Sequence, residues 1–227
     1  MVHHALCNII EPIFERSFIS DSYASRKGKG SHAALDRVTR AMRRTDYCLK
    51  LDISRYFPSI DHGILMGLVK RKVSCERTLG LVVRILSNSP RDVGPVSWFA
   101  GDGLLDPLTR RTGLPLGNQT SQFFGNVYLD PLDHYVKEAL GCRHYVRYVD
   151  DIVVLGDDKG LLWDVRDAIR EFAGRRLRLA LHPRKQTVAP VTFVLPIEPV
   201  TRTILDEFAG DAYKLIEDSA RHGLYPR

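Results

Sequence analysis

Two adjacent carboxylates, Asp150 and Asp151, stand inside an otherwise apolar stretch, "HYVRYVDDIVVLG", at residues 144–156. Burying an unpaired carboxylate costs on the order of several kcal/mol, and two neighbouring carboxylates also repel each other. If the flanking residues form antiparallel strands, the pair lies at the tight turn, where its side chains can leave the core. A divalent cation would then offset the repulsion. Oxygen ligands without a nearby His or Cys favour Mg²⁺ or Mn²⁺ over zinc.

A third carboxylate, Asp52, ends another apolar strand pattern, "CLKLD". If the two strands that end in acids converge, Asp52 joins Asp150 and Asp151 around two ions roughly 3.5–4 Å apart. Such a pair of ions stabilises both the attacking and the leaving oxygen in phosphoryl transfer. The alternative is an ordinary Asp-Asp hairpin turn together with an unrelated Asp at a strand end, because such turns are common.

The elements that must position these acids follow from apolar periodicity. Helical spacing covers 5–18, 32–44, 62–72, 76–88, 119–140 (with a kink at Pro131), 160–175 and 203–222. Strand patterns cover 47–57, 143–149, 152–156, 177–181 and 189–195. A loop rich in Pro and Gly, with room for a short hairpin, covers 89–117. Helices and strands interleave without a regular βαβ alternation, which predicts an α+β fold.

The bulk composition bounds the class of protein. With 227 residues, 44% of them hydrophobic, the chain can bury the core of one large domain or two small ones. Its net charge of +6 suits a polyanionic partner, although a solvated basic surface would give the same charge. The chain has four cysteines: Cys7, Cys48, Cys75 and Cys142. Their spacing does not match that of metal ligands, which argues against a zinc site or a disulfide framework. Because no membrane-spanning run, signal peptide or lipidation motif is present, we expect a cytoplasmic protein without a membrane partner.

Three blocks follow one another along the chain: "LKLDISRYFPSID", "GLPLGNQTSQFFGNVYLDPLDHYV" and "YVDD". They resemble motifs A, B and C of reverse transcriptases, and the resemblance runs from residue 5 to about 187. It implies the palm of a right-hand polymerase with fingers, two Mg²⁺ ions (or Mn²⁺), deoxynucleotide substrates, an RNA template and an RNA/DNA primer duplex. The leading interpretation is therefore an RNA-directed DNA polymerase.

Two stretches narrow the resemblance to one subgroup of reverse transcriptases. "SYASRKGKGSHAAL" and "LPLGNQTSQ", with Gln122 where many reverse transcriptases carry proline, are similar to the enzymes of diversity-generating retroelements. Those bacterial and phage enzymes copy a template-repeat RNA into mutagenised cDNA with an accessory protein partner. Group II intron and retron enzymes share the motifs more loosely and remain alternatives.

The resemblance assigns roles to residues around the acids. Asp52, Asp150 and Asp151 become the catalytic carboxylates and, with Ile53, the metal site. Phe57 matches the aromatic steric gate, whose ring would clash with a ribonucleotide 2′-OH and so select dNTPs. The alternative for Phe57 is a simple core position.

Substrate contacts are implied in three further places. Arg26, Lys27 and Lys29 fall in a fingers motif and would contact the triphosphate or the template, unless the loop is merely solvated. Arg55 lies where backbone amides meet the triphosphate. Lys185 matches the motif D lysine near the departing pyrophosphate, a possible proton donor, although a surface lysine in a basic loop is the alternative.

Motif B carries a departure from the family pattern. Gly117 would permit close approach of the incoming nucleotide and the templating base. Leu116 stands where many relatives have glutamine, and leucine offers only apolar contact near the sugar. Because polar contacts discriminate more sharply, we predict low fidelity.

The resemblance also divides the chain into regions. These are a fingers-like segment 1–50, palm motif A 51–61, fingers and palm helices with a loop 62–112, palm 113–197 and a C-terminal helix 198–227 as a possible thumb remnant. A single helix cannot grip a primer duplex as a bundle would, so we expect a reduced or absent thumb and a partner or RNA that supplies the missing surfaces. Rival interpretations are a polymerase-derived nucleic-acid-binding or assembly subunit without its own activity, and an RNA-copying polymerase, which Phe57 disfavours.

Overall fold

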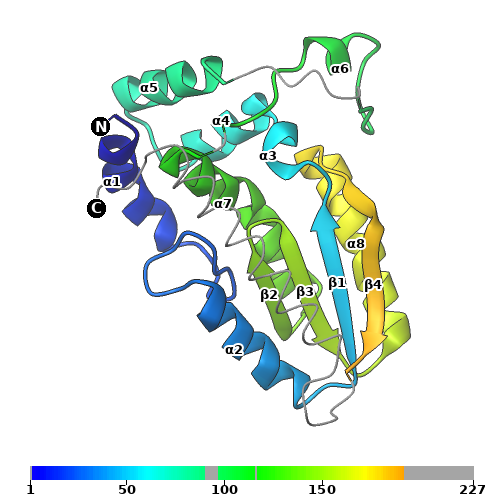
Figure 1. The fold of residues 1–227 in the computed structure, drawn as a ribbon. Helices are drawn as coiled ribbons and strands as arrows, with labels where there is room; N and C mark the ends of the chain where they lie inside the picture. The colour runs from blue at the N-terminus through cyan, green and yellow to red at the C-terminus, as the bar shows by residue number, and fades with distance from the viewer. Residues whose placement is uncertain (1, 90–96, 116, 192–227) are drawn as a thin grey trace.

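Four antiparallel strands in the order β2-β3-β1-β4 form the sheet at the centre of the computed structural model, which describes residues 2–89, 97–115 and 117–191 (Figure 1). The strands are β1 (Tyr47–Ile53), β2 (His144–Tyr148), β3 (Asp151–Gly156) and β4 (Leu181–Pro190). The helices are α1 (Val2–Glu15), α2 (Ser31–Met42), α3 (Tyr56–Ser59), α4 (His62–Lys70), α5 (Glu76–Ser87), α6 (Asp106–Thr109), α7 (Gln119–His134) and α8 (Lys159–Leu177). A π-helix, η1 (Tyr135–Ala139), continues α7. The predicted α+β class is confirmed.

Strand alternation gives the sheet two apolar faces. On β1, Leu49 and Leu51 face the larger core, which α7 and α8 cover. Cys48 points to the opposite face, where it packs with Val153 and Val38 of α2. Because successive side chains of a strand point to opposite faces, Asp52 extends the row of Cys48 rather than that of the large core. The acid at the end of β1 therefore lies on the α2 side of the sheet.

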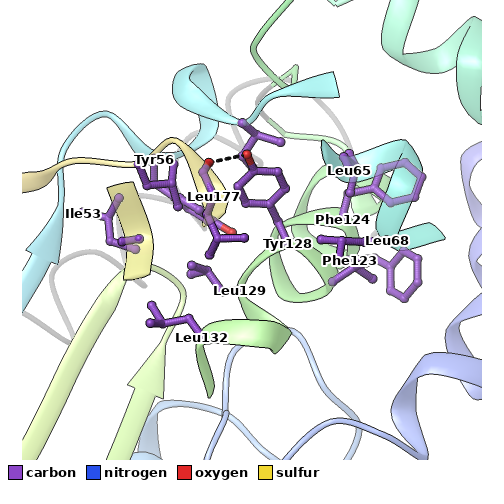
Figure 2. Close-up of a cluster of buried hydrophobic side chains, with 14 of the residues drawn as sticks. Ile53, Tyr56, Leu65, Leu68, Phe123, Phe124, Tyr128, Leu129, Leu132 and Leu177 are labelled. Carbon is purple, nitrogen blue, oxygen red and sulfur yellow. Dashed lines mark hydrogen bonds between the residues drawn. The ribbon is translucent and has the colours of Figure 1, made fainter. Parts of the chain in front are cut away.

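Helix α7 supplies the centre of the larger core. Phe123 and Phe124 pack toward α4, and Tyr128 lies at the centre of the cluster (Figure 2). The Tyr128 hydroxyl donates to the backbone oxygen of Leu177 at 2.6 Å and accepts from the Asp61 amide at 3.2 Å. One phenol thus ties the end of α8 to the start of α4.

Local capping signals begin two of the helices. Asp61 accepts from the amides of Gly63 and Ile64 at 2.7 and 3.0 Å at the start of α4. Asp158 does the same for α8, with bonds of 2.6 and 3.1 Å. An acidic N-cap satisfies amides that have no partner within the helix. These caps explain why the helices predicted from 62 and 160 begin close to those positions.

The strand predicted over 47–57 is shorter than expected. It ends at Ile53, because Arg55 adopts a left-handed φ of 48° that turns the chain. Helix α3 then includes Pro58, which the first turn of a helix tolerates since its missing amide would have no partner there. The prediction failed because alternation alone does not show a turn residue that is not glycine.

The strand after α8 is also placed differently. The prediction of a strand over 177–181 is wrong, because α8 continues to Leu177 and β4 begins at Leu181. β4 therefore includes the segment around Lys185 that the sequence indicated as a loop. It pairs with β1 on one side only, and an edge strand carries polar side chains that mask its alternation. Of the strand predicted over 189–195, the first two residues end β4 and 192–195 lie outside the described residues.

Three further predictions have mixed outcomes. The helix predicted over 119–140 is confirmed, and it leaves α-helical geometry in η1, four residues after Pro131. In 97–115, the described part of the predicted loop, the chain forms the short helix α6 and no hairpin. The helix at 203–222 and the thumb remnant at 198–227 lie outside the described residues. Across the described ranges, no helix combines the length and apolarity needed to cross a bilayer.

Candidate functional site

Asp52 and Asp151 meet at the ends of β1 and β3. Leu51 pairs with Ile152 in the antiparallel register, so their neighbours Asp52 and Asp151 lie at the same end of the sheet. Both carboxylates are largely buried, with 8% and 6% of their residue surfaces exposed. The register thus brings together acids that are 99 positions apart in the chain.

A two-residue turn presents the acidic pair. Tyr148 pairs with Asp151, so only Val149 and Asp150 connect β2 to β3. Val149 has a φ of 55°, whereas Asp150 keeps a negative φ, which is the φ pattern of a type II′ turn. A β-branched residue at positive φ costs about 1–3 kcal/mol. The predicted hairpin is confirmed, with the difference that Asp151 already belongs to β3.

Lys185 of β4 reaches the same place. Its Nζ lies 3.5 Å from Oδ2 of Asp52, and its side chain is 56% exposed. A register shift in the pairing of β1 with β4, between Leu51 and Ile53, lies beside this contact. The lysine therefore brings one positive charge to Asp52, one of the three carboxylates predicted to bind metal ions.

The donor set at this end of the sheet suits a hard divalent cation. Asp52, Asp150 and Asp151 offer oxygen atoms only, which Mg²⁺ and Mn²⁺ prefer. The side chain of Ile53 is buried in the core, so only its backbone oxygen can contribute. Between residues 2 and 191, apart from the undescribed positions, no group of three or more His, Cys, Asp or Glu side chains is placed to hold a metal ion. The residues fit the ions by chemistry, and the metal site stays a prediction.

The Phe57 ring lies against helix α7. A Cβ atom on Gly125 would come within 3.3 Å of Phe57 Cε1, so the glycine makes the close approach possible. The Tyr56 hydroxyl donates to the Gly125 backbone oxygen at 2.5 Å. The backbone oxygen of Phe57 accepts from the Leu114 amide at 3.0 Å, which fixes this segment beside motif B. The ring is half-buried, as a wall of a site or an edge of the core would be.

Arg26 is engaged within the chain. Its guanidinium donates to the Glu15 carboxylate at 2.6 to 3.1 Å and to the backbone oxygens of Ile19 and Ser22 at 2.6 and 2.8 Å. Its side chain is only 5% exposed. The predicted triphosphate contact would require Arg26 to give up some of these bonds.

The other basic residues of this loop differ from Arg26. Lys29 donates to the backbone oxygen of Ser20 at 2.7 Å and lies over the Tyr23 ring. Lys27 is exposed. A turn at Gly28, with a φ of 74°, places the two lysines on the surface of the loop before α2.

The predicted motif B residues are placed in part. Gly117 has a φ of 84°, a left-handed conformation that glycine adopts without strain. Gln122 accepts from the Ser25 hydroxyl at 2.8 Å, which joins α7 to the basic loop. Leu116 lies outside the described residues. Arg55 is exposed at the start of α3, one turn past Asp52.

Sequence reasoning missed a buried polar cluster behind the hairpin. It comprises Arg147, Asp133, Tyr145, Asn126 and Ser22. The available signal was a charged residue within the apolar strand pattern "HYVRYV", since a charge is rarely buried without a partner. It also missed Lys50, which lies two positions before Asp52 on the same face of β1.

Residues 1–197 match the family described as reverse transcriptase (RNA-dependent DNA polymerase). Protein YkfC of Escherichia coli (strain K12) is 28% identical over 145 residues, which are 61% of this chain and 35% of that protein. The group II intron-encoded protein LtrA of Lactococcus lactis subsp. cremoris is 26% identical over 136 residues, 60% of this chain and 21% of LtrA. This chain thus spans about a third of the length of these relatives or less.

Solved structures share the fold. Telomerase from Candida albicans, in complex with a TWJ fragment of telomeric RNA, gives a TM-score of 0.55 at 14% identity, over 86% of this chain and 35% of that chain. Telomerase from Candida tropicalis, truncated from its C-terminal domain, gives a TM-score of 0.55 at 14% identity, over 83% of this chain and 40% of that chain. The predicted polymerase-type α+β architecture is thereby confirmed. On the match of residues 1–197, the chain belongs to the reverse transcriptase (RNA-dependent DNA polymerase) family.

Proposed function

We propose that this chain is an RNA-directed DNA polymerase that extends a primer by two-metal-ion nucleotidyl transfer. The observation that carries the proposal is the pairing of Leu51 with Ile152, the chain neighbours of Asp52 and Asp151, with Asp150 in the adjoining turn. Members of the reverse transcriptase family generally use divalent metal ions. When bound, Mg²⁺ or Mn²⁺ would stabilise the attacking and leaving oxygens.

The residues of the chain have defined parts in this proposal. The carboxylates of Asp52, Asp150 and Asp151, with the backbone oxygen of Ile53, would hold the ions. The ammonium of Lys185, which lies 3.5 Å from Asp52, would give a proton to the departing pyrophosphate.

Substrate selection is assigned to the surrounding residues. Phe57, whose ring lies against Gly125, would exclude a ribonucleotide by clashing with its 2′-OH. We assign the remaining nucleotide and template contacts to Arg26, Lys27, Lys29, Arg55, Leu116, Gly117 and Gln122. Lys27 is exposed, whereas Lys29 already donates to the Ser20 backbone oxygen and Arg26 must first leave Glu15. Contact of Lys27 with the triphosphate is therefore better supported than contact by Arg26.

Within the family, we propose an error-prone enzyme of a diversity-generating retroelement that works with an accessory protein. The motif B sequence supports this, and Gln122 additionally bonds the basic loop through Ser25. The second candidate is a group II intron type of enzyme, which the relative LtrA favours. Replacing Leu116 by Gln should lower the error rate of the cDNA, because an amide adds a polar contact near the sugar. An unchanged error spectrum would contradict this expectation.

The boundaries of the functional regions belong to the same proposal. We assign 1–50 to fingers, 51–61 and 113–197 to the palm, 62–112 to helices of both, and 198–227 to a reduced thumb. The proposed ligands are an RNA template with an RNA/DNA primer duplex and dNTPs. An accessory protein partner is proposed to help hold the duplex.

Primer extension on an RNA template with dNTPs and Mg²⁺ tests the proposal. We expect extension by the wild-type chain and none by a variant that combines Asp150→Ala with Asp151→Ala. Asp157→Ala, an exposed acid just after β3, is the matched control and should extend normally.

The alternatives predict different outcomes in the same assay. An RNA-copying polymerase would prefer rNTPs to dNTPs. If the wild type extends nothing, alone or with candidate partner protein and RNA, the chain is a nucleic-acid-binding or assembly subunit, and the polymerase proposal is wrong.

A further inference from the structure

Arg147 carries a charged side chain into the core behind the acidic hairpin. It lies on β2 and is 1% exposed. Its Nε and Nη2 each donate to one oxygen of Asp133 at 2.7 Å, and Asp133 also accepts from the Tyr145 hydroxyl at 2.6 Å. Burial alone would lower the pKa of Arg147, but the Asp133 carboxylate raises it above its ordinary value. The guanidinium therefore stays charged in the core.

The remaining arm of this guanidinium reaches the turn. Nη1 donates to the backbone oxygen of Val149 at 2.8 Å and to Oδ1 of Asn126 at 3.1 Å. Val149 is the residue with the unfavourable φ of 55°, and Asp150 follows it. Because the donors of a guanidinium point in fixed directions, this one side chain fixes the position of the strained turn relative to α7.

The backbone of Arg147 also forms hydrogen bonds to the N-terminal segment of the chain. Its amide donates to the Asp21 oxygen at 2.9 Å, and its own oxygen accepts from the Tyr23 amide at 3.0 Å. Its Nη2 also donates to the Ser22 hydroxyl at 3.2 Å. These residues lead directly into the basic loop at 26–30. The hairpin is thus supported from β2, from α7 and from the segment before the loop.

We infer that Arg147 is a positioning residue that sets the metal affinity of the hairpin by holding the Val149 carbonyl and, with it, the acidic pair that follows. The inference rests on the proposed function, because it concerns the same carboxylates. Without the Nη1 bond, the turn can relax toward the negative φ that a β-branched residue prefers. That rotation would carry Asp150 and Asp151 away from Asp52.

Two substitutions separate this role from plain core stability. Arg147→Lys keeps a positive charge beside Asp133, but one ammonium cannot also serve the Val149 carbonyl in the directions of a guanidinium. Val149→Gly removes the cost of the positive φ, so the turn depends less on the Nη1 bond. Tyr145→Phe is the matched control, because it removes a buried bond to Asp133 and leaves the Val149 contact intact.

The test measures Mn²⁺ binding to the free chain by electron paramagnetic resonance, with the unfolding temperature recorded for each variant. We expect R147K to bind Mn²⁺ roughly 10-fold or more weakly than the wild type. Y145F should unfold at a lower temperature and bind Mn²⁺ normally. Adding V149G to R147K should restore part of the binding. If R147K does not fold, Asn126→Asp is the second variant, because its carboxylate draws Nη1 away from the Val149 oxygen. It also loses the donor to the Ala24 backbone oxygen, a change in stability that the unfolding temperature reports.

Each result has one meaning. A wild-type chain that binds no Mn²⁺ overturns the proposed function and the inference with it. If the wild type binds Mn²⁺ and R147K, or N126D in its place, binds as well as Y145F, only the inference is overturned. Failure of V149G to restore any binding to a folded R147K also overturns it, because a relaxed turn would then not be the cause of the loss.

Discussion

At the scale of single residues, Gly125 shows how little space separates α7 from the segment after β1. An added Cβ would lie 3.3 Å from Phe57 Cε1 and 3.4 Å from Tyr56 Cε1. Real Cβ atoms rarely approach other atoms so closely, so one of the rings would have to move. The Tyr56 hydroxyl is bonded to the Gly125 oxygen, which leaves the Phe57 ring as the freer of the two.

Replacing Gly125 by Ala should therefore displace the Phe57 ring. We expect poorer discrimination against rNTPs, measured as the ratio of primer extension with dNTPs and with rNTPs. Overpacking should also lower the free energy of unfolding in urea by about 1–3 kcal/mol. Gly80→Ala in α5, where an added Cβ meets open space, is the control and should stabilise the chain by up to about 1 kcal/mol. If the Gly125→Ala variant folds and discriminates against rNTPs as well as the wild type, Phe57 does not select the sugar.

The acids themselves were predictable from the sequence, and their partners were not. An apolar pattern interrupted by two adjacent acids predicts a turn, because the core excludes them. Nothing local shows that Arg26 pairs with Glu15 or that Arg147 pairs with Asp133, since each pair depends on how elements pack. The carboxylates are therefore recognisable in the sequence, whereas the arginine that supports them is not.

At the scale of elements, α7 ends in a cluster of titratable groups. Burial raises the pKa of Asp130 from 3.8 to about 6, and nearby His134 partly opposes that shift. His134 Nε2 lies 3.4 Å from Asp130 Oδ1, and its Nδ1 lies 2.6 Å from a Glu138 oxygen. Burial lowers the pKa of His134, but its bonds to Glu138 and to the Ser17 backbone oxygen raise it overall. The end of α7 is thus sensitive to pH.

The raised pKa of Asp130 gives stability a definite pH dependence. Since the folded chain holds this proton more tightly than the unfolded chain, the stabilisation is complete below about pH 3.8 and is lost as pH rises through about 6. Asp130→Asn should therefore raise the free energy of unfolding above about pH 6 by about 1–2 kcal/mol, allowing for solvent screening. Urea unfolding over a pH series checks this, with the exposed Asp167→Asn as control. Superimposable pH curves for wild type and D130N would contradict it.

Elements differed in how well the sequence predicted them. Helices α4 and α8 carry both an apolar stripe and an acidic cap, so two signals agree. β4 carries charged and polar residues along an exposed edge, and its partner β1 lies more than a hundred positions away. Strand pairing over that separation leaves no local trace, which explains why the middle of β4, around Lys185, has the pattern of a loop.

At the scale of the whole molecule, the charge is distributed over exposed arginines and lysines on several elements. Arg40, Arg43 and Arg44 are exposed at the end of α2, and Arg175 and Arg176 at the end of α8. With a net charge of +6, these surfaces suit a nucleic-acid backbone. α2 covers the sheet face on which Asp52 lies (Figure 1).

Binding of a primer–template duplex should therefore weaken steeply with salt. We expect the dissociation constant, measured by fluorescence anisotropy, to rise about tenfold or more between about 50 and 200 mM KCl, because bound phosphates release counterions. A variant with Arg40, Arg43 and Arg44 changed to Gln should show a shallower dependence. Arg77→Gln, on α5, is the single-charge comparison. An affinity independent of salt would mean that these charges do not meet the duplex.

The support of the acidic hairpin also bears on the order in which the chain folds. Arg147 contacts Ser22, which precedes it by 125 positions, and both must be in place before the turn is held from every side. Contacts between such distant residues form slowly, because a long loop must close first. During synthesis, α1 and α2 emerge from the ribosome before α7 and β2, the elements on which they pack, and β4 emerges after the hairpin. The acidic end of the sheet can therefore form only when nearly all of the described chain has been made, and so can any metal site there.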